Sequence, residues 1–314
     1  MLDRHEYEQL LLAKAEIMMR GAVYASSTRR FYAENWATFQ TWCERAGRSA
    51  LPACQETVAL YLTELMLSGK KLATVRRHST SIRHQHLQNG LESPTAGEVK
   101  RLLKGAQRMR CERPVQKAPV TLSLLCQMLT ALKGPGERVA RNRAILEIGF
   151  ASALRRRSLC NLDLCDVGLR ERGILLQIKN EKQDRRGLGR VAAVARGSSI
   201  ETCPVVALEN WLKVRGSTAG PLFTPVFGKR AMSGRLHPVT IAYVVKQAAR
   251  DVGLDPAEFG GHSLRAGFVT QAFENGVNEI VIAQHTAHRS LASLRRYLRQ
   301  SDPFRGNPSS MIGL

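Results

Sequence analysis

The chain has 314 residues, 47 of them Lys or Arg and 26 Asp or Glu, which gives a formal net charge of +21. This excess indicates a polyanionic partner, with nucleic acid favoured over an anionic membrane surface. The 44% of hydrophobic residues is typical of a globular protein, whereas no apolar run reaches membrane-spanning length and the N-terminus lacks a secretion signal, so we expect a cytoplasmic location and no membrane partner.

The first third of the sequence has helical periodicity. An apolar stripe at spacing i, i+4, i+7 and i+11 predicts a core-facing helix and consists of Tyr32, Trp36, Phe39 and Cys43. Ser26 or Ser27 is a candidate N-cap for this helix, and Gly47 is a candidate stop. Three further helices are expected at 54–68, 72–89 and 96–110.

The expected helix at 72–89 is unusually basic. It carries Arg76, Arg77, His78, Arg83, His84 and His86. Any single one of them fits an ordinary solvated face, but the set favours contact with a DNA backbone. Our candidate DNA contacts over the whole chain are Arg29, Arg30, Arg76, Arg77, Arg83 and Lys246.

The segment CERPVQKAPVT at 111–121 contains two prolines and no periodicity, which predicts an extended linker. We therefore expect a helical domain at 1–112, a linker at 113–120 and a second domain with a C-terminal tail at 121–314. In the second domain the pattern predicts strands at 173–179 and 190–196. The helices expected there are 122–132, 137–152, 204–214, 238–252, 263–275 and 277–286.

Several motifs in the second domain could carry chemistry. The stretch GGHSLRAGF sets His262 and Arg265 three residues apart, on one face if it forms a helix. An arginine cluster at 155–157 follows a predicted helix, and Lys179 and Lys182 lie at the end of a strand in a predicted hairpin. Each pattern alone is more often an ordinary packed or solvated feature.

His288 and Tyr297 lie nine residues apart in HTAHRSLASLRRYLR. On one unbroken helix this spacing would put them on opposite sides. They can converge only if the helix restarts between them, and Ser290 is a plausible N-cap for a new helix beginning at Leu291. A lone tyrosine on an amphipathic helix usually anchors the helix in the core. A role for Tyr297 as a reactant therefore depends on which other catalytic side chains accompany it in the sequence.

Taken in order, these residues resemble the tyrosine recombinase (phage integrase) family. Its signature is an arginine after a helix, a hairpin lysine, H-x-x-R, a histidine or tryptophan, and a tyrosine nine residues later. The corresponding positions are Arg155, Lys182, His262, Arg265, His288 and Tyr297. The resemblance implies a mainly α fold with a small β-sheet, in which a helical core-type DNA-binding domain accompanies an α/β catalytic domain.

The same resemblance implies an activity. A site-specific recombinase of this kind cleaves and rejoins double-stranded DNA through a 3′-phosphotyrosine and a Holliday junction, with four protomers on two sites. Tyr297 would be the nucleophile, Arg155 and Arg265 would stabilise charge on the phosphate, and Lys182 would be the general acid. His262 fits proton transfer with the tyrosine, and His288 fits a hydrogen bond to the phosphate. Neither metal nor high-energy cofactor is expected, because the phosphotyrosine stores the bond energy.

Two positions depart from the family pattern. The acidic residue often found three positions after the first arginine is Ser158, and the usual Leu-Gly before the second histidine is Thr286-Ala287. Arg155 also has two arginine neighbours that compete for its role. The tail after Tyr297 is a candidate for docking onto a neighbouring protomer, with a frayed terminus as the alternative.

Other functions fit parts of the sequence. His262, His285 and His288 could serve a metal-dependent nuclease, but no acidic cluster completes such a site. The stretch GLGRVA resembles a dinucleotide fingerprint but runs into a predicted strand, which indicates a hairpin turn. Seven cysteines without a C-x-x-C pair are expected to be reduced and structural. A type IB topoisomerase or a catalytically silent DNA-binding regulator would share much of the pattern.

Overall fold

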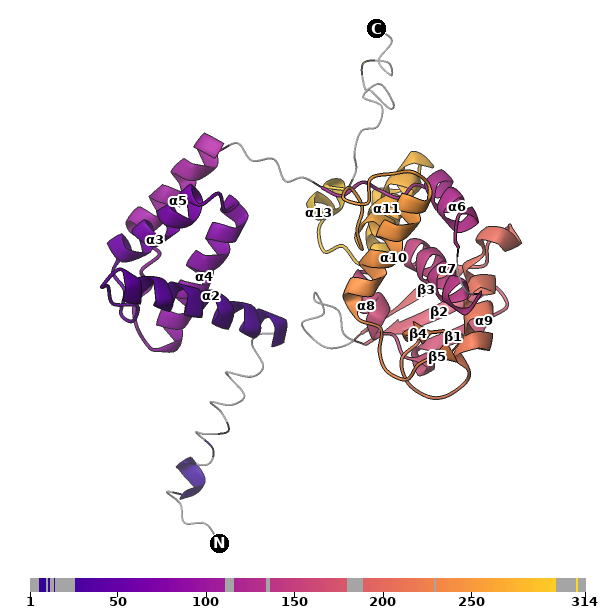
Figure 1. Cartoon of the computed structure of the whole chain (residues 1–314), viewed down its shortest axis with the longest axis horizontal. Helices are drawn as coiled ribbons and strands as arrows, with labels where there is room; N and C mark the ends of the chain where they lie inside the picture. The colour runs from indigo at the N-terminus through magenta and orange to yellow at the C-terminus, as the bar shows by residue number, and fades with distance from the viewer. Residues whose placement is uncertain are drawn as a thin grey trace. The chain divides into compact units, whose positions relative to one another are not determined.

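In the computed structural model the chain divides into two compact units, residues 1–115 and 116–314 (Figure 1). The structure describes residues 6–9, 11, 14, 26–110, 116–133, 136–179, 189–228, 230–297 and 309. The division falls within the predicted linker, while the DNA-binding role of the first unit stays a prediction.

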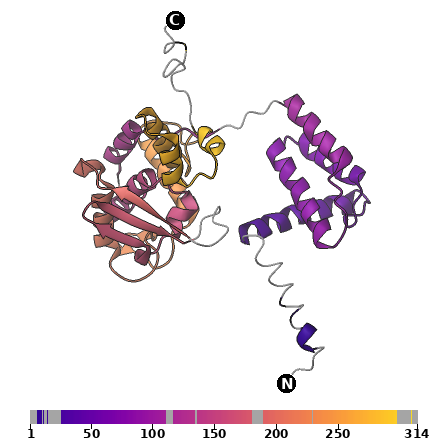
Figure 2. The ribbon, with the colours of Figure 1, turned by 180° about the vertical axis from the view of Figure 1, so that it is seen from behind.

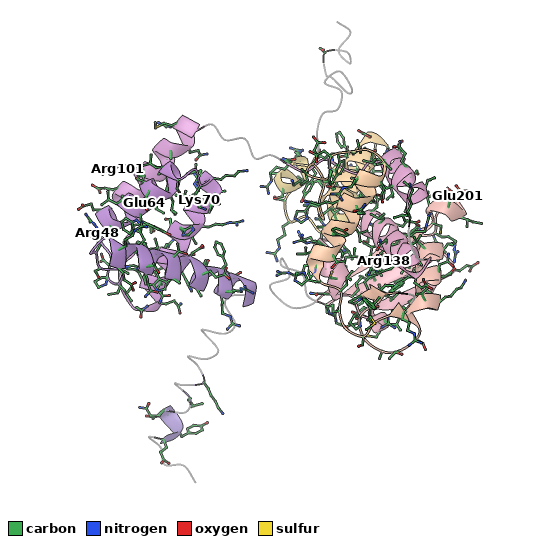
Figure 3. All side chains as sticks on the ribbon, viewed as in Figure 1. Arg48, Glu64, Lys70, Arg101, Arg138 and Glu201 are labelled. Atoms are coloured by element: carbon green, nitrogen blue, oxygen red, sulfur yellow. The ribbon has the colours of Figure 1, made fainter. Side chains whose placement is uncertain are left out.

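The described part of the first unit is helical around one core. Its helices are α2 (Ser26–Arg45), α3 (Gln55–Leu67), α4 (Leu72–Gln88) and α5 (Gly97–Arg110). The predicted stripe on α2 is confirmed, because Trp36, Phe39 and Cys43 are buried in this core and Tyr32 is half-buried. Long exposed side chains lie on the outside, among them those labelled Lys70 and Arg101 in Figure 3.

The second unit packs helices on a small antiparallel sheet (Figures 1 and 2). The helices are α6 (Leu122–Thr130), α7 (Gly136–Ala151), α8 (Arg156–Asn161), α9 (Pro204–Arg215), α10 (Pro238–Asp251), α11 (Ser263–Glu274), α12 (Glu279–Thr286) and α13 (Leu291–Arg295). The strands β1 (Val167–Arg170), β2 (Gly173–Ile178) and β3 (Arg190–Ala195) lie in that order, and β4 (Val226–Phe227) pairs with β5 (Arg230–Ala231).

One face of the three-stranded sheet is buried against α7 and α9. Residues of β2 alternate between core and solvent, so Ile174 and Leu176 point inward opposite Val194 and Ala192 of β3. The sequence predicted this strand as a short apolar run beside a polar turn, and the structure adds the alternation. On the helical side the core contains the buried Trp211 of α9.

The short elements were missing from the sequence prediction. Helix α8 has six residues and β1 has four, too few for either periodicity to be visible. Helix α8 follows a sharp turn after α7, in which Ala153 has φ +48°. Tertiary packing on α10 then supports it.

The end of the predicted linker is bound to the second unit. The N–H groups of Ala118 and Val120 donate to the carbonyls of Glu258 and Ser263 at 2.8 and 3.0 Å. Val120 also packs against Gly267 of α11, where a Cβ would lie 1.6 Å from the Val120 oxygen. Residues 116–120 therefore run beside the start of α11.

The described residues bear on two expectations from the sequence, that the cysteines are reduced and that no segment spans a membrane. The six cysteines among them are free thiols. None of the described helices is both long and apolar enough to cross a membrane.

Candidate active site

Four of the predicted catalytic residues lie at the adjoining ends of α11, α12 and α13. Helix α11 begins at Ser263 with His262 as its N-cap residue, so Arg265 is one turn further along. The Arg265 side chain is fully buried. Its Nη1 donates to the Ala153 carbonyl at 2.7 Å, and its Nη2 lies 3.0 Å from Nε2 of His288. Arg265 therefore connects the turn before Arg155 to the second histidine.

His288 is placed by the way α12 ends. Ala287 follows the helix in the left-handed conformation (φ 52°, ψ 51°), and the His288 N–H donates to the Ala283 carbonyl at 2.9 Å. This is the Schellman arrangement, which usually employs glycine at the left-handed position. The methyl group of Ala287 makes the turn costly, but the turn aims the His288 ring at Arg265.

The predicted helix restart is confirmed. Ser290 is the N-cap of α13, and its side chain accepts a hydrogen bond from the Ser293 N–H. Because the chain breaks there, the rings of His288 and Tyr297 meet with centroids 5.2 Å apart. Tyr297 is half-buried against the small cluster of Val269, Ile282 and Leu294. The nine-residue spacing thus gives contact where a continuous helix would prevent it.

His262 lies at the surface and its surroundings favour the neutral imidazole. Desolvation by neighbouring atoms lowers its pKa below the usual 6.5, and the positive charges of Arg265, Arg156 and Arg155 lower it further. A neutral imidazole at physiological pH can accept a proton, as proton transfer with a tyrosine requires.

The three neighbouring arginines differ in their positions. Arg155 is the N-cap residue of α8 and Arg156 opens the helix, and both are half-buried, whereas Arg157 is exposed. The carbons of the Arg156 side chain pack against Gly261, directly before His262. The structure therefore brings two arginines to His262, and the assignment to Arg155 stays a prediction.

Lys182 lies outside the described residues, but the strands flanking it are anchored. Lys179, after β2, forms an ion pair with the buried Asp166. Arg190, at the start of β3, donates to the His285 carbonyl at 3.3 Å. The hydrogen bond and charge of Asp166 raise the pKa of Lys179, which makes that lysine a weaker proton donor.

A hollow of about 260 Å³ adjoins Ser158, the position where the family often has an acidic residue. Asp166 and Asp163 both line it, the latter paired with Arg235 at 2.6 Å. Asp166 keeps a pKa below its usual value although burial alone would raise it, because Lys179 and the Asp163 N–H stabilise the carboxylate. Two aspartates from the following loop thus supply negative charge beside Ser158.

The candidate DNA contacts are mostly exposed. Arg29, Arg30, Arg76, Arg77 and Arg83 all lie at the surface of the first unit, and Lys246 is half-buried on α10. Arg30 pairs with Glu34 at 2.7 Å, Arg76 donates to Gln107 at 2.6 Å, and Arg77 lies over the Phe31 ring. Their role in DNA binding stays a prediction.

The expectation that all the basic residues of α4 contact DNA is wrong for two histidines. His78 is buried and its Nδ1 hydrogen-bonds the Tyr61 hydroxyl at 2.8 Å. His86 is fully buried, and its Nε2 accepts from the Ala53 N–H at 2.9 Å. Both stabilise the interior of the first unit, because each ring satisfies a polar group that would otherwise be buried without a partner.

The histidines considered as metal ligands serve other contacts. Nε2 of His285 lies 2.9 Å from the Ala151 carbonyl, and the His285 ring stacks on Phe268. In the part of the chain that the structure describes, no three His, Cys, Asp or Glu side chains are grouped as a metal site would require.

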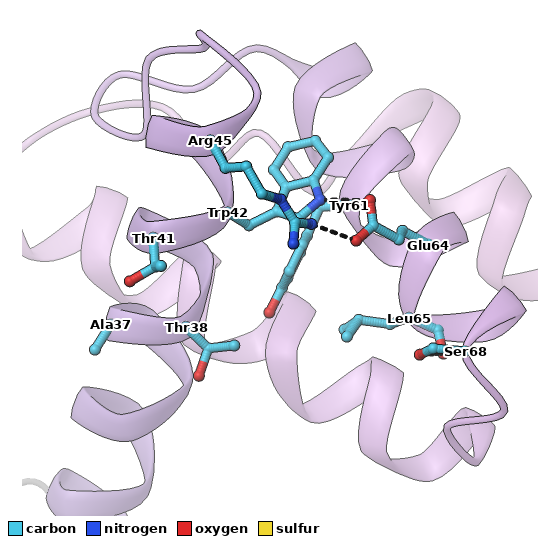
Figure 4. Close-up of a pocket in the computed structure, with 9 residues that line it drawn as sticks. All are labelled: Ala37, Thr38, Thr41, Trp42, Arg45, Tyr61, Glu64, Leu65 and Ser68. Atoms are coloured by element: carbon cyan, nitrogen blue, oxygen red, sulfur yellow. Dashed lines mark hydrogen bonds and ion pairs between the residues drawn. The ribbon is translucent and has the colours of Figure 1, made fainter.

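A hollow of about 560 Å³ lies in the first unit, between α2 and α3 (Figure 4). Glu64 lines this hollow and accepts hydrogen bonds from Trp42 Nε1 at 2.7 Å and from Arg45 Nη2 at 2.6 Å. These groups satisfy one another, and none of them belongs to the predicted catalytic set.

Sequence reasoning missed two contributors to the catalytic cluster. One is the Ala153 carbonyl, which holds Arg265 and gives no side-chain signal. The other is the Thr286 hydroxyl, 2.6 Å from Nδ1 of His288. Thr286 was visible in the sequence only as a departure from the family pattern.

Comparison with known proteins places this geometry in a family. The phage integrase family profile matches residues 122–303. An integrase/recombinase xerD homolog of Selenomonas ruminantium is 31% identical over 291 residues, which cover 90% of this chain and 84% of the relative.

Two solved structures share the fold. The XerH site-specific recombinase in a post-cleavage complex with palindromic difH substrate matches with a TM-score of 0.66 at 18% identity, over 90% of this chain and 79% of that one. A lambda integrase tetramer bound to a Holliday junction matches with a TM-score of 0.60 at 14% identity, over 92% and 76%. Since the family profile spans more than half of the sequence and the bacterial relative most of it, the chain belongs to the phage integrase family and is a tyrosine site-specific recombinase.

Proposed function

We propose that this recombinase cleaves DNA by attack of the Tyr297 hydroxyl on a phosphodiester, which gives a 3′-phosphotyrosine and a free 5′-hydroxyl. The observation that carries the proposal is the contact of the Tyr297 ring with His288, whose Nε2 in turn lies 3.0 Å from the buried Arg265. A tyrosine beside a guanidinium and an imidazole has the partners that attack on an anionic phosphate requires.

Charge stabilisation falls to the arginines. Attack builds negative charge on the non-bridging oxygens, and guanidinium groups with fixed donors can stabilise it without a metal. Arg265 is suited to this because the Ala153 carbonyl holds one of its nitrogens in place. Arg155 is the second candidate, with Arg156 as its competitor beside His262.

Proton transfer falls to His262 and Lys182. The lowered pKa of His262 keeps it neutral and able to take the tyrosine proton. The departing 5′ oxygen needs a proton. We assign its delivery to Lys182, because Lys179 is held in an ion pair with Asp166. Arg190, at the start of β3, donates to the carbonyl of His285, three residues before His288, which supports a location of this end of β3 beside the site.

The DNA partner and the assembly follow from the relatives. XerH is bound to a difH substrate, and lambda integrase forms a tetramer on a Holliday junction. We extend both to this chain: it would bind double-stranded sites as a homotetramer and exchange one pair of strands at a time. The exposed arginines of the first unit and the net charge of +21 support the DNA-binding part of this proposal.

Covalent capture tests the proposal and selects the DNA site in the same experiment. A pool of duplexes with a randomised centre and a nick would be incubated with the protein, and adducts that survive SDS would be isolated and sequenced. We expect adducts on a common sequence with wild type and none with Tyr297→Phe. Equal retention by both proteins would show that Tyr297 is not the nucleophile.

Two companion measurements separate the remaining candidates. Recombination between two copies of the selected site distinguishes a recombinase from an enzyme that only relaxes supercoils, as a type IB topoisomerase does. Comparing Lys182→Ala with Lys179→Ala on substrates whose 5′ leaving group needs no proton identifies the general acid. Only the loss caused by removing the true acid should be rescued by such a substrate.

A further inference from the structure

We propose that Thr286 is a positioning residue which fixes the tautomer of His288 and thereby the orientation of Arg265. The inference rests on the proposed function, because it assigns Thr286 a part in the same site. The family usually has leucine at this position, which has no hydroxyl to offer. Thr286 is fully buried in the last turn of α12.

The Thr286 hydroxyl has two close partners. Its Oγ1 lies 2.6 Å from the Ile282 carbonyl, one turn earlier in the helix, and 2.6 Å from Nδ1 of His288. A carbonyl oxygen can only accept, so the single hydroxyl proton belongs to the bond with Ile282. Towards His288 the hydroxyl therefore presents a lone pair, and Nδ1 must carry the hydrogen.

The contact with Arg265 is compatible with this assignment. With Nδ1 protonated, the neutral imidazole has its lone pair on Nε2. Arg265 Nη2 lies 3.0 Å from Nε2 and 3.4 Å from Nδ1, so the guanidinium lies over the face of the ring, where it can approach either tautomer. The Nδ1–H form therefore follows from the Thr286 contact.

Together the contacts link His288 to the backbone of α12. His288 Nδ1–H donates to Thr286, and Thr286 donates to the Ile282 carbonyl, while Arg265 Nη2 lies against the face of the His288 ring. The other end of the Arg265 guanidinium donates to the Ala153 carbonyl. The two hydrogen bonds through Thr286 polarise each other in the same sense, so removing one weakens the other.

The functional consequence concerns Arg265. A guanidinium held between the Ala153 carbonyl and a ring of fixed orientation keeps its own orientation before DNA arrives, and less reorganisation is then needed when charge develops on the phosphate. Without the hydroxyl, Nδ1 of His288 loses its acceptor, and the ring is no longer fixed against Arg265. Thr286 thus acts through His288 and touches no reacting atom.

The test pairs two substitutions. Thr286→Val replaces the hydroxyl with a methyl group of similar size, whereas Thr286→Ser keeps the hydroxyl. On the nicked duplex selected by covalent capture, we expect Thr286→Val to slow formation of the phosphotyrosine adduct by about 10- to 100-fold, the usual range for a group that orients a reactive side chain. We expect Thr286→Ser to stay within about threefold of wild type, because its hydroxyl can make the same bonds.

A spectroscopic measurement separates positioning from mere packing. In protein labelled with ¹⁵N-histidine, at about pH 8 where an ordinary imidazole is neutral, the long-range proton couplings distinguish Nδ1 from Nε2. The His288 signals are identified by their absence from His288→Gln. Wild type and Thr286→Ser should show a protonated Nδ1, and Thr286→Val should show a shift of the proton towards Nε2.

The outcomes are distinguishable. A protonated Nε2 in wild type would overturn the tautomer assignment, and a wild-type cleavage rate in Thr286→Val would overturn the positioning role. Loss of rate without any change of tautomer would reduce Thr286 to packing and also overturn the proposal. If wild type itself forms no adduct, the proposed function fails, while the nuclear magnetic resonance measurement still decides the state of His288.

Discussion

Replacing Ala287 with glycine should stabilise the second unit. Ala287 has φ 52° and is one of two non-glycine residues with positive φ among those described, the other being Ala153. A Cβ in the left-handed region costs about 1–2 kcal/mol. Relief of this strain should stabilise the glycine variant, but about 0.4–1 kcal/mol of the stabilisation is lost because glycine makes the unfolded chain more flexible.

The expected net gain is about 0.5–1 kcal/mol, reduced slightly by the loss of a half-buried methyl group. Gly276 provides the matched control. It occupies the same position after α11 with φ +77°, and a Cβ there would have no atom within 4 Å. Gly276→Ala should therefore cost about 1 kcal/mol from backbone conformation alone.

Urea unfolding of the full chain measures both changes. The protein has three tryptophans, and Trp211 alone lies in the second unit. In protein labelled with 5-fluorotryptophan, the ¹⁹F signal that disappears in Trp211→Phe reports unfolding of that unit. The reasoning would be refuted if Ala287→Gly failed to raise the midpoint while Gly276→Ala lowered it, because the left-handed strain would then not govern stability at Ala287.

Three further predictions concern packing, pH and salt. Gly267→Ala should destabilise the second unit by about 3 kcal/mol or more, since its Cβ would lie 1.6 Å from the Val120 oxygen. Gly136→Ala, at the start of α7 where a Cβ would have no atom within 4 Å, should be neutral or stabilising in the same urea titration, and comparable effects of the two substitutions would contradict this. Burial raises the pKa of Glu147 from 4.5 to about 7, although Arg143 opposes the rise, so the folded state holds a proton that the unfolded chain releases. Stability should therefore fall as pH rises from 4.5 to 7, and Glu147→Gln should flatten that slope; an unchanged slope would refute the cause. Affinity for the selected DNA site should fall steeply with salt, with a slope smaller by about 1 in Arg83→Ala, and a flat response would count against a phosphate-dominated interface.

Local pattern was sufficient for much of the fold. The α2 stripe, the apolar run of β2 beside its polar turn and the restart after Ser290 are local features of the chain, so they can be recognised without the tertiary structure. The six family positions could be recognised in the same way, because their order and spacing are properties of the chain.

Tertiary structure decided what each polar side chain meets. His78 and His86 have the same composition signal as the exposed arginines beside them, yet they are buried by Tyr61 and Ala53, which lie 17 and 33 residues away. Local periodicity does not reveal a partner at that separation, because burial depends on which helices pack together.

The sequence by itself determined that two arginines, a lysine, two histidines and a tyrosine occur in the order of a recombinase. Only the tertiary structure decided how they are held: Arg265 reaches across 23 residues to His288 and across 112 to Ala153. Likewise, the sequence shows only that Thr286 occupies a position where the family usually has leucine, whereas the fold shows that its hydroxyl contacts His288. The physical reason is that hydrogen-bond direction depends on atoms brought together by folding, whereas residue order does not.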